Sequence, residues 1–135
     1  MIETMMNYAH ALLLMKIPYK WGGYCPLNGL DCSGFAQEVL ASIGKDPVGD
    51  QTAQTLYDIM RVYCKEDIVK RGSFLFFGRH KKEITHVAVA IDDKYMYEAG
   101  GGGSSTISWE EAIKKNAMVR IRPIRKDLLC FLNLE

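Results

Sequence analysis

The sequence has no large excess of charge of either sign, which limits the partners that it can attract electrostatically. Its 17 basic and 16 acidic side chains give a formal net charge of +1 and are scattered along the chain. Proteins that bind nucleic acid or an anionic membrane surface usually carry a basic patch or stripe. The sequence therefore predicts neither nucleic acid nor a membrane as the main partner.

The sequence also lacks the cysteine spacing of a zinc site. None of its four cysteines forms a C-x-x-C pair, and no metal or organic cofactor is expected. Residues 1–23 combine an early acidic residue with a short apolar core and no small-residue cleavage site, which fits neither a secretory signal nor a membrane span. We therefore expect synthesis in the cytoplasm and reduced thiols, with a Cys25–Cys32 disulfide or resolving thiol as the alternative.

Internal repeats, low-complexity runs and linkers are absent, so residues 1–135 are expected to form a single domain. Apolar spacing predicts helices over residues 3–16 and 32–43 and within 50–63. A capped short helix is predicted over 109–116, and a structured loop over 18–31. Aromatic and β-branched runs predict strands over 73–78, 85–92, 94–100 and 117–124. This order favours an α+β fold, with N-terminal helices packed on a largely antiparallel sheet.

One cysteine has polar neighbours on both sides at the predicted start of a helix. In "GLDCSGF", residues 29–35, Cys32 lies between Asp31 and Ser33. The first turn of a helix offers unpaired N–H groups and the positive end of the helix dipole, and both favour a thiolate. Cys32 is therefore a candidate nucleophile that needs a base, normally a histidine brought close by the fold.

Three histidines are candidates for that base. His10 lies within the first predicted helix and His80 in a basic turn, whereas His86 opens an apolar strand. Strand alternation places His86 on one face with Ala88 and Ala90, small residues that would allow the cysteine helix to pack closely. The alternative is a hydrogen-bonded histidine at a strand end with no catalytic role.

Glu98, in the next predicted strand, is a candidate for orienting the imidazole. If a three-residue turn pairs Ala90 with Lys94, then His86 lies directly opposite Glu98. A two-residue turn shifts the register by one and places Ala99 opposite His86 instead. The alternative for Glu98 is a solvated carboxylate at a strand end.

Together these motifs resemble the NlpC/P60 family of papain-like cysteine peptidases. The resemblance rests on "PYKWGG", "LDCSGF", an apolar strand ending in glycine, "THVAVAID", and a polar residue twelve positions after the histidine, and it covers roughly residues 8–124. It implies that a helical half delivers the cysteine to a sheet that carries the histidine. It also implies hydrolysis of an amide bond in peptidoglycan stem peptides, commonly between D-glutamate and a diamino acid.

The resemblance also implies a role for individual residues. Cys32 corresponds to the nucleophile and His86 to the general base. Glu98 stands where the family usually has His, Asn or Gln, and a carboxylate there would favour a thiolate–imidazolium pair. Tyr19 corresponds to the tyrosine whose hydroxyl helps to bind the oxyanion together with the N–H of the cysteine.

Further residues correspond to substrate-binding positions or adjoin them. Asp31 and Ser33 match positions associated with the free amino end of the stem peptide. Trp21 is expected either to line the cleft beside Tyr19 or to anchor the loop as a buried side chain. The glycine run 100–103 has no P-loop context, so we expect it to bring backbone close to the cleft or to form a mobile rim, with a flexible turn as the alternative.

Three functions remain open from the sequence. The first is a peptidoglycan endopeptidase, and "EAGGGGS" resembles bacteriophage-borne members of the family, which implies phage tail or lysis proteins as partners and action from a virion or after release. The second is a non-catalytic wall-binding or structural virion component, suggested by Glu98. The third is an amidase or acyltransferase that acts on another amide or ester.

Overall fold

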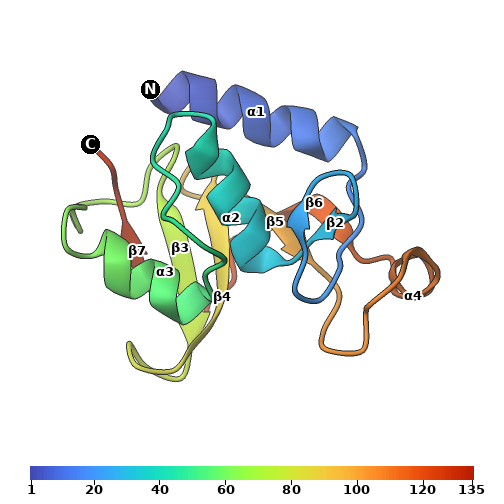
Figure 1. The fold of residues 1–135 in the computed structure, drawn as a ribbon. Helices are drawn as coiled ribbons and strands as arrows, with labels where there is room; N and C mark the ends of the chain where they lie inside the picture. Colours follow the sequence, from blue (N-terminus) through green and yellow to red (C-terminus); the bar gives the residue numbers. More distant parts are fainter.

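A five-stranded antiparallel sheet forms the centre of the computed structural model, which describes residues 1–135 (Figure 1). Its strands are β3 (Phe74–Gly78), β4 (Ile84–Ala90), β5 (Tyr95–Gly100), β6 (Met118–Pro123) and β7 (Leu128–Leu132), in the spatial order β6-β5-β4-β3-β7. The helices are α1 (Ile2–Leu14), α2 (Cys32–Ala41), α3 (Ala53–Met60) and α4 (Trp109–Lys115). The expected α+β fold with a largely antiparallel sheet is confirmed.

The two faces of the sheet are covered differently. Residues of α1, α2 and α3 pack with Val87 and Val89 of β4 in a cluster of 27 buried residues. The opposite face carries a smaller cluster of five buried residues, including Ala88 and Ala90. Figure 1 shows α2 and α3 lying across one face of the sheet, with α1 beside α2. None of the helices is long and apolar enough to cross a bilayer.

Side-chain caps explain where three of the helices begin. Asp31 accepts from the Gly34 N–H at 2.7 Å before α2, and Thr52 accepts from the Thr55 N–H before α3. Ser108 does the same before α4. Each cap satisfies an N–H that has no partner within its helix. The predicted start of a helix at Cys32 is therefore confirmed.

Two parts of the secondary structure differ from the sequence-based expectation. Residues 18–31, expected to be a loop, contain the short paired strands β1 (Tyr24–Cys25) and β2 (Gly29–Leu30). The C-terminal strand β7 was not expected and pairs with β3 at the edge of the sheet. Its apolar run of five residues shows no alternation, and its partner strand lies more than fifty residues earlier in the chain.

The predicted β4–β5 register is also wrong, although its consequence for the site survives. Ala90 pairs with Met96, not with Lys94, because Ile91 and Tyr95 close the hairpin. Compared with the register of a three-residue turn, the pairing of β5 against β4 is shifted by two positions. Because side chains in a strand alternate between faces with a period of two, such a shift leaves each side chain on the same face. Glu98 therefore keeps its face and meets His86 diagonally rather than directly across.

Candidate active site

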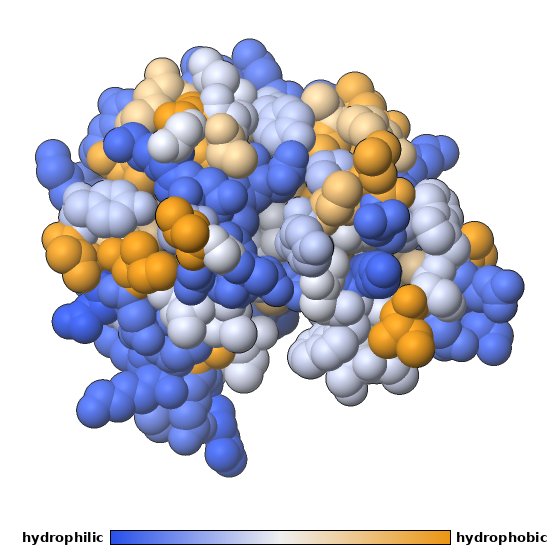
Figure 2. Space-filling model, in the orientation of Figure 1, coloured by the Kyte–Doolittle hydropathy of each residue, from blue (hydrophilic) through white to orange (hydrophobic).

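A pocket of about 600 Å³ lies where the start of α2 meets the ends of β4 and β5. Its walls also include the loop before β1, residues 50–53 at the start of α3, the glycine run 100–103, and Arg125. Figure 2 shows a notch in the lower edge of the molecule, between the part carrying α3 and the part carrying the segment before α4. The lining residues are mostly polar, with Cys32, His86 and Glu98 among them.

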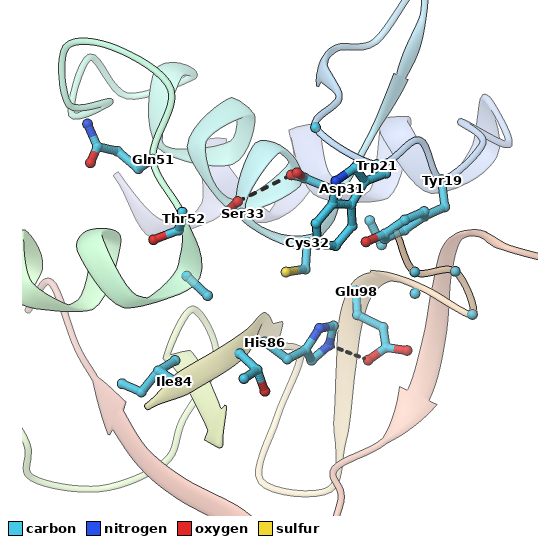
Figure 3. Close-up of a pocket in the computed structure, with 18 of the residues that line it drawn as sticks. Tyr19, Trp21, Asp31, Cys32, Ser33, Gln51, Thr52, Ile84, His86 and Glu98 are labelled. Carbon is cyan, nitrogen blue, oxygen red and sulfur yellow. Dashed lines mark hydrogen bonds and ion pairs between the residues drawn. The ribbon is translucent and has the colours of Figure 1, made fainter. Parts of the chain in front are cut away.

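Local backbone structure holds Cys32 at the edge of this pocket. It is the first residue of α2, directly after the Asp31 cap, whose Oδ1 also accepts from Ser33 Oγ at 3.2 Å. A Cβ on Gly34 would overlap the Gly23 carbonyl oxygen, so this glycine lets the helix start lie against the preceding loop. Figure 3 shows the sulfur of Cys32 directed from α2 toward His86.

The imidazole of His86 lies between Cys32 and Glu98. Its Nε2 is 2.9 Å from Glu98 Oε1, and Nδ1 is on the Cys32 side of the ring (Figure 3). With Nε2–H donating to the carboxylate, the Nδ1 lone pair of a neutral ring faces the cysteine. Burial lowers the pKa of His86, but interactions with Cys32 and Glu98 outweigh it and raise the pKa to about 9. Both partners therefore favour the imidazolium form of the ring.

Glu98 is a buried carboxylate with two cationic partners. Besides His86, it contacts Arg120, whose Nε donates to Oε2 at 3.0 Å and whose Nη2 lies 2.9 Å from the same oxygen. Burial alone would raise the pKa of Glu98, but hydrogen bonds and charge from His86 and Arg120 lower it to about 2. The alternative of a solvated carboxylate is wrong, because only 3% of Glu98 is exposed.

Arg120 is a residue of the site that the sequence interpretation missed. It lies directly opposite Glu98 in the β5–β6 ladder, within the predicted strand 117–124. The available signal was the presence of two arginines, Arg120 and Arg122, in a strand whose other residues are apolar, since opposite charges that face each other across two strands stabilise the pair. Without the register of β5 against β6, the partner of Arg120 was not identifiable.

The glycine run after Glu98 brings backbone against three site side chains. A Cβ on Gly100 would overlap the Glu98 carboxylate and approach Arg120, and one on Gly102 would overlap the Tyr19 ring. The expectation that glycine lets backbone approach the cleft is therefore confirmed, since all four glycines line the pocket. These close approaches set the positions of Glu98 and Tyr19 from one side.

Tyr19 lines the pocket beside the start of α2. Tyr19 is 6% exposed. Burial raises the pKa of its phenol, and the charges of Cys32 and Asp31 raise it further. The hydroxyl therefore stays protonated and is available as a donor. The Cys32 backbone N–H, at the first helical position, has no partner within α2. The two donors are the groups that the family resemblance associates with an oxyanion.

The predicted substrate-binding residues also line the pocket. Asp31 is partly buried, Ser33 is buried, and Trp21 is 54% exposed. The alternative of Trp21 as a buried anchor is therefore wrong. Burial raises the pKa of Asp31, with a further contribution from the nearby Asp50 carboxylate, although hydrogen bonds from Gly34 and Ser33 oppose the shift.

The prediction about the face of His86 is wrong in one respect. The cysteine helix packs on the Val87 and Val89 face, whereas Ala88 and Ala90 belong to the cluster on the opposite face. His86 pairs with Phe77 next to a register shift between Phe77 and Gly78. Cys32 approaches His86 at the end of β4, where the imidazole reaches the pocket. The small residues Ala88 and Ala90 therefore do not account for the proximity of Cys32 and His86.

The remaining candidate residues lie outside the pocket. His10 Nδ1 is 2.7 Å from the Tyr97 hydroxyl, and His80 Nε2 lies 3.2 Å from Glu83 Oε1 at the surface. All four cysteines are free, and Cys25 in β1 is not bonded to Cys32. No group of three or more His, Cys, Asp or Glu side chains has a metal-binding arrangement.

Comparison with known proteins agrees with this fold and with the motifs. The model of the NlpC/P60 family matches residues 16–123. The chain is 32% identical over 103 residues to the bifunctional muramidase/DL-endopeptidase CwlT of Bacillus subtilis, which covers 75% of this chain and 30% of CwlT. The chain thus spans less than a third of that relative.

Two solved structures share the fold. The NlpC/p60 domain of the peptidoglycan hydrolase SagA gives a TM-score of 0.70 at 21% identity, covering 98% of each chain. RipD of Mycobacterium tuberculosis, described as a non-catalytic NlpC/p60 domain protein adapted to peptidoglycan binding, gives 0.64 at 18% identity, covering 96% of this chain and 95% of its own. The fold thus occurs in hydrolytic and non-catalytic proteins.

Proposed function

The chain belongs to the NlpC/P60 family, and we propose that it is a cysteine endopeptidase that hydrolyses an amide bond in peptidoglycan stem peptides. The observation that carries the proposal is the Cys32–His86–Glu98 arrangement, in which His86 Nε2 is 2.9 Å from a buried carboxylate and Nδ1 faces the thiol. The similarity to CwlT, a DL-endopeptidase, favours the bond between D-glutamate and the following diamino acid.

The proposed reaction begins from a thiolate–imidazolium pair. Cys32 Sγ attacks the amide carbonyl carbon, and the imidazolium gives its Nδ1 proton to the amide nitrogen as the C–N bond breaks. The released fragment is an amine, and the other fragment remains as a thioester on Cys32. Water then attacks the thioester while His86 takes its proton, and the carboxylic acid leaves as the thiolate is restored.

In this proposal Glu98 performs the orienting role that an amide or imidazole has in other family members. A carboxylate accepting from Nε2–H fixes the tautomer of the neutral ring and stabilises the imidazolium that precedes it. Arg120 neutralises the second carboxylate oxygen and holds Glu98 ionised in a buried position. The departure from the usual family residue is therefore compensated by a second charged residue.

Further residues are assigned to substrate in the same proposal. The Tyr19 hydroxyl and the Cys32 N–H bind the carbonyl oxygen as it becomes negative. Asp31 and Ser33 hold the free amino end of the stem peptide, and the exposed Trp21 ring covers the chain beside Tyr19. We also propose that the protein reaches the wall after release or within a virion, alongside phage tail or lysis proteins.

Digestion of defined stem peptides tests the proposed function. The wild-type protein and Cys32→Ala are incubated with muropeptides, and the products are identified by mass spectrometry. We expect a new amine between the second and third stem residues with the wild type and none with Cys32→Ala. Ser42→Ala, which removes a partly buried hydroxyl that donates to the Val39 carbonyl at the far end of α2, is the control and should cleave normally.

Two results would replace the proposal. If neither protein cleaves but both are retained on purified cell walls, the chain is a wall-binding protein, as RipD is described to be. If the wild type cleaves unrelated amides or esters in preference to muropeptides, it is an amidase or acyltransferase. Loss of cleavage in Cys32→Ala with retention on walls would assign the thiol to chemistry and not to binding.

A further inference from the structure

Charge is distributed unevenly around the pocket. Asp31 and Asp50 lie at the starts of α2 and α3, close enough for the Asp50 charge to act on Asp31. Arg125, in the turn between β6 and β7, is the only lysine or arginine that lines the pocket. Its guanidinium lies over the Phe77 ring, 4.5 Å from the centroid, and Phe77 pairs with His86 in the sheet. Asp31 and Asp50 therefore lie at the α2–α3 end of the pocket, and Arg125 lies at the His86 end, where Glu98 is already paired with His86 and Arg120.

Arg125 is held in place by Asp127 and keeps an unused N–H donor group. Its Nε and Nη2 each donate to one Asp127 oxygen at 3.0 Å, a two-point contact that fixes the plane of the guanidinium. Nη1 has no partner in the protein. Asp127 does not line the pocket, so a molecule bound there meets the guanidinium and not the carboxylate that holds it. A planar cation fixed in this way is suited to bind a carboxylate.

We propose that Arg125 is a specificity-determining residue that binds a carboxylate on the fragment released as the amine. This inference rests on the proposed function and adds a substrate requirement to it. Nothing in the reaction itself requires a charge on the released fragment, so the requirement comes from the pocket.

The direction of the reaction assigns Arg125 to that fragment. The group that protonates the leaving nitrogen must be next to it, so the released amine lies on the His86 side of the broken bond. Arg125 lies on this side through its contact with Phe77, which pairs with His86. Asp31 and Ser33 lie on the Cys32 side, where the acyl fragment is held. The pocket is thus complementary to a substrate with an amine on the acyl fragment and a carboxylate on the released fragment.

A purely structural role for Arg125 predicts a different result. The Arg125–Asp127 pair spans two residues of one turn, and exposed ion pairs of this kind contribute little to stability. If the arginine only shapes the turn, its removal will affect every substrate alike. If it binds a carboxylate, the effect will depend on the charge of the substrate.

Two stem tripeptides that differ in one group separate these roles. One ends in a free carboxylate on its third residue, and the other carries a carboxamide there. We expect the wild type to cleave the carboxylate form with a kcat/KM about tenfold higher, as for one charge-assisted contact in a partly exposed site. Arg125→Gln should remove this preference. Lys126→Gln, which removes the same charge from the neighbouring exposed residue, should retain it.

The inference is overturned if the wild type shows no preference, or if Arg125→Gln lowers cleavage of both peptides equally. Failure of the proposed function has a different signature, since the wild type would then cleave neither peptide. In that event calorimetry with Cys32→Ala and with Cys32→Ala/Arg125→Gln measures the affinity for the two peptides directly. Equal affinities in Cys32→Ala would reject the carboxylate site, and a preference lost with Arg125→Gln would support it.

Discussion

The two halves of the site are built by different means. On the helix side, Asp31, Cys32 and Tyr19 are positioned by local backbone structure, namely a helix cap and a glycine-containing loop packed against it. On the sheet side, His86 and Glu98 are positioned by strand pairing and by hydrogen bonds between charged groups. The helix half therefore depends on backbone geometry, and the sheet half depends on charge.

This difference determines how each half should fail. Removing a charged partner from the sheet half leaves another buried charge without compensation, which is costly in a low-dielectric site. Removing a cap from the helix half exposes an N–H to water or substrate and costs less. Removing a charged partner from the sheet half should therefore change chemistry first, whereas removing the helix cap should cost the helix half little stability.

Among the residues that support Cys32, the largest effect is expected from Glu98→Ala. Without an acceptor at Nε2 the imidazole loses its orientation and the charge that favours its protonated form. We expect kcat to fall about 100- to 10,000-fold, the range of general acid–base contributions. The kcat is measured by quenching stem-peptide cleavage at set times and quantifying the product. Full activity in Glu98→Ala would remove this carboxylate from the mechanism.

Arg120 should act through Glu98 as a positioning residue. We expect Arg120→Gln to lower kcat by roughly tenfold to a hundredfold with little change in KM, because Glu98 loses the partner that keeps it ionised and fixed. The low-pH limb of the rate profile should move to higher pH, and Arg120→Lys should restore part of the rate. Arg122→Gln, on the same strand and exposed, is the control.

A double substitution sharpens the same point. Glu98→Gln can accept from His86 or from Arg120, but its amide N–H₂ then faces the other donor. Glu98→Gln/Arg120→Gln removes this conflict. The fold-loss of kcat in the double variant should therefore be smaller than the product of the fold-losses in the two single variants. Strict additivity would show that the two side chains act independently.

Gly100→Ala tests the close approach of backbone to the sheet half. The added methyl would overlap the Glu98 carboxylate, so we expect a loss of roughly 1–3 kcal/mol in the free energy of unfolding, together with reduced activity. Denaturant unfolding measures the first effect. Gly103→Ala is a matched control, because nothing lies within 4 Å of its added Cβ. Equal stability of the two variants would contradict the described packing.

The smallest effect on stability is expected from the cap in the helix half. Asp31→Ala removes the cap of α2 and should lower the free energy of unfolding by about 1 kcal/mol, the usual value for such a cap. Thermal or denaturant unfolding measures it, with Ser108→Ala at the cap of α4 for comparison. A loss as large as that from Gly100→Ala would mean that the helix half is not the more tolerant one.

The same contrast explains what the sequence reveals. Cys32 and its cap are encoded in a few consecutive residues, so the start of α2 was predictable from the pattern alone. His86 and Glu98 were identified, but the register that joins them was not, because hairpin pairing depends on turn geometry and on both sheet faces. Arg120 and β7 depend on partners distant in the chain, and no local pattern specifies such pairings.

The raised pKa of His86 has a defined effect on stability. Because the folded value of about 9 exceeds the ordinary value of 6.5, protonation of His86 stabilises the fold. This contribution is fully present below about pH 6.5 and is lost as the pH rises through 9. The Glu98 contribution also stabilises the fold but depends on pH in the opposite direction: it is present above pH 4.5 and is lost as the pH falls through about 2.

Direct titration of His86 tests whether the charged sheet half supports the chemistry of Cys32. Heteronuclear NMR of histidine-labelled protein follows all three imidazoles, and His86→Gln assigns the signal. We expect His86 to titrate near pH 9 in the wild type and clearly lower in Glu98→Gln. A wild-type His86 that titrates at or below 6.5, unchanged by Glu98→Gln, would contradict the account of a site organised by the Glu98 carboxylate.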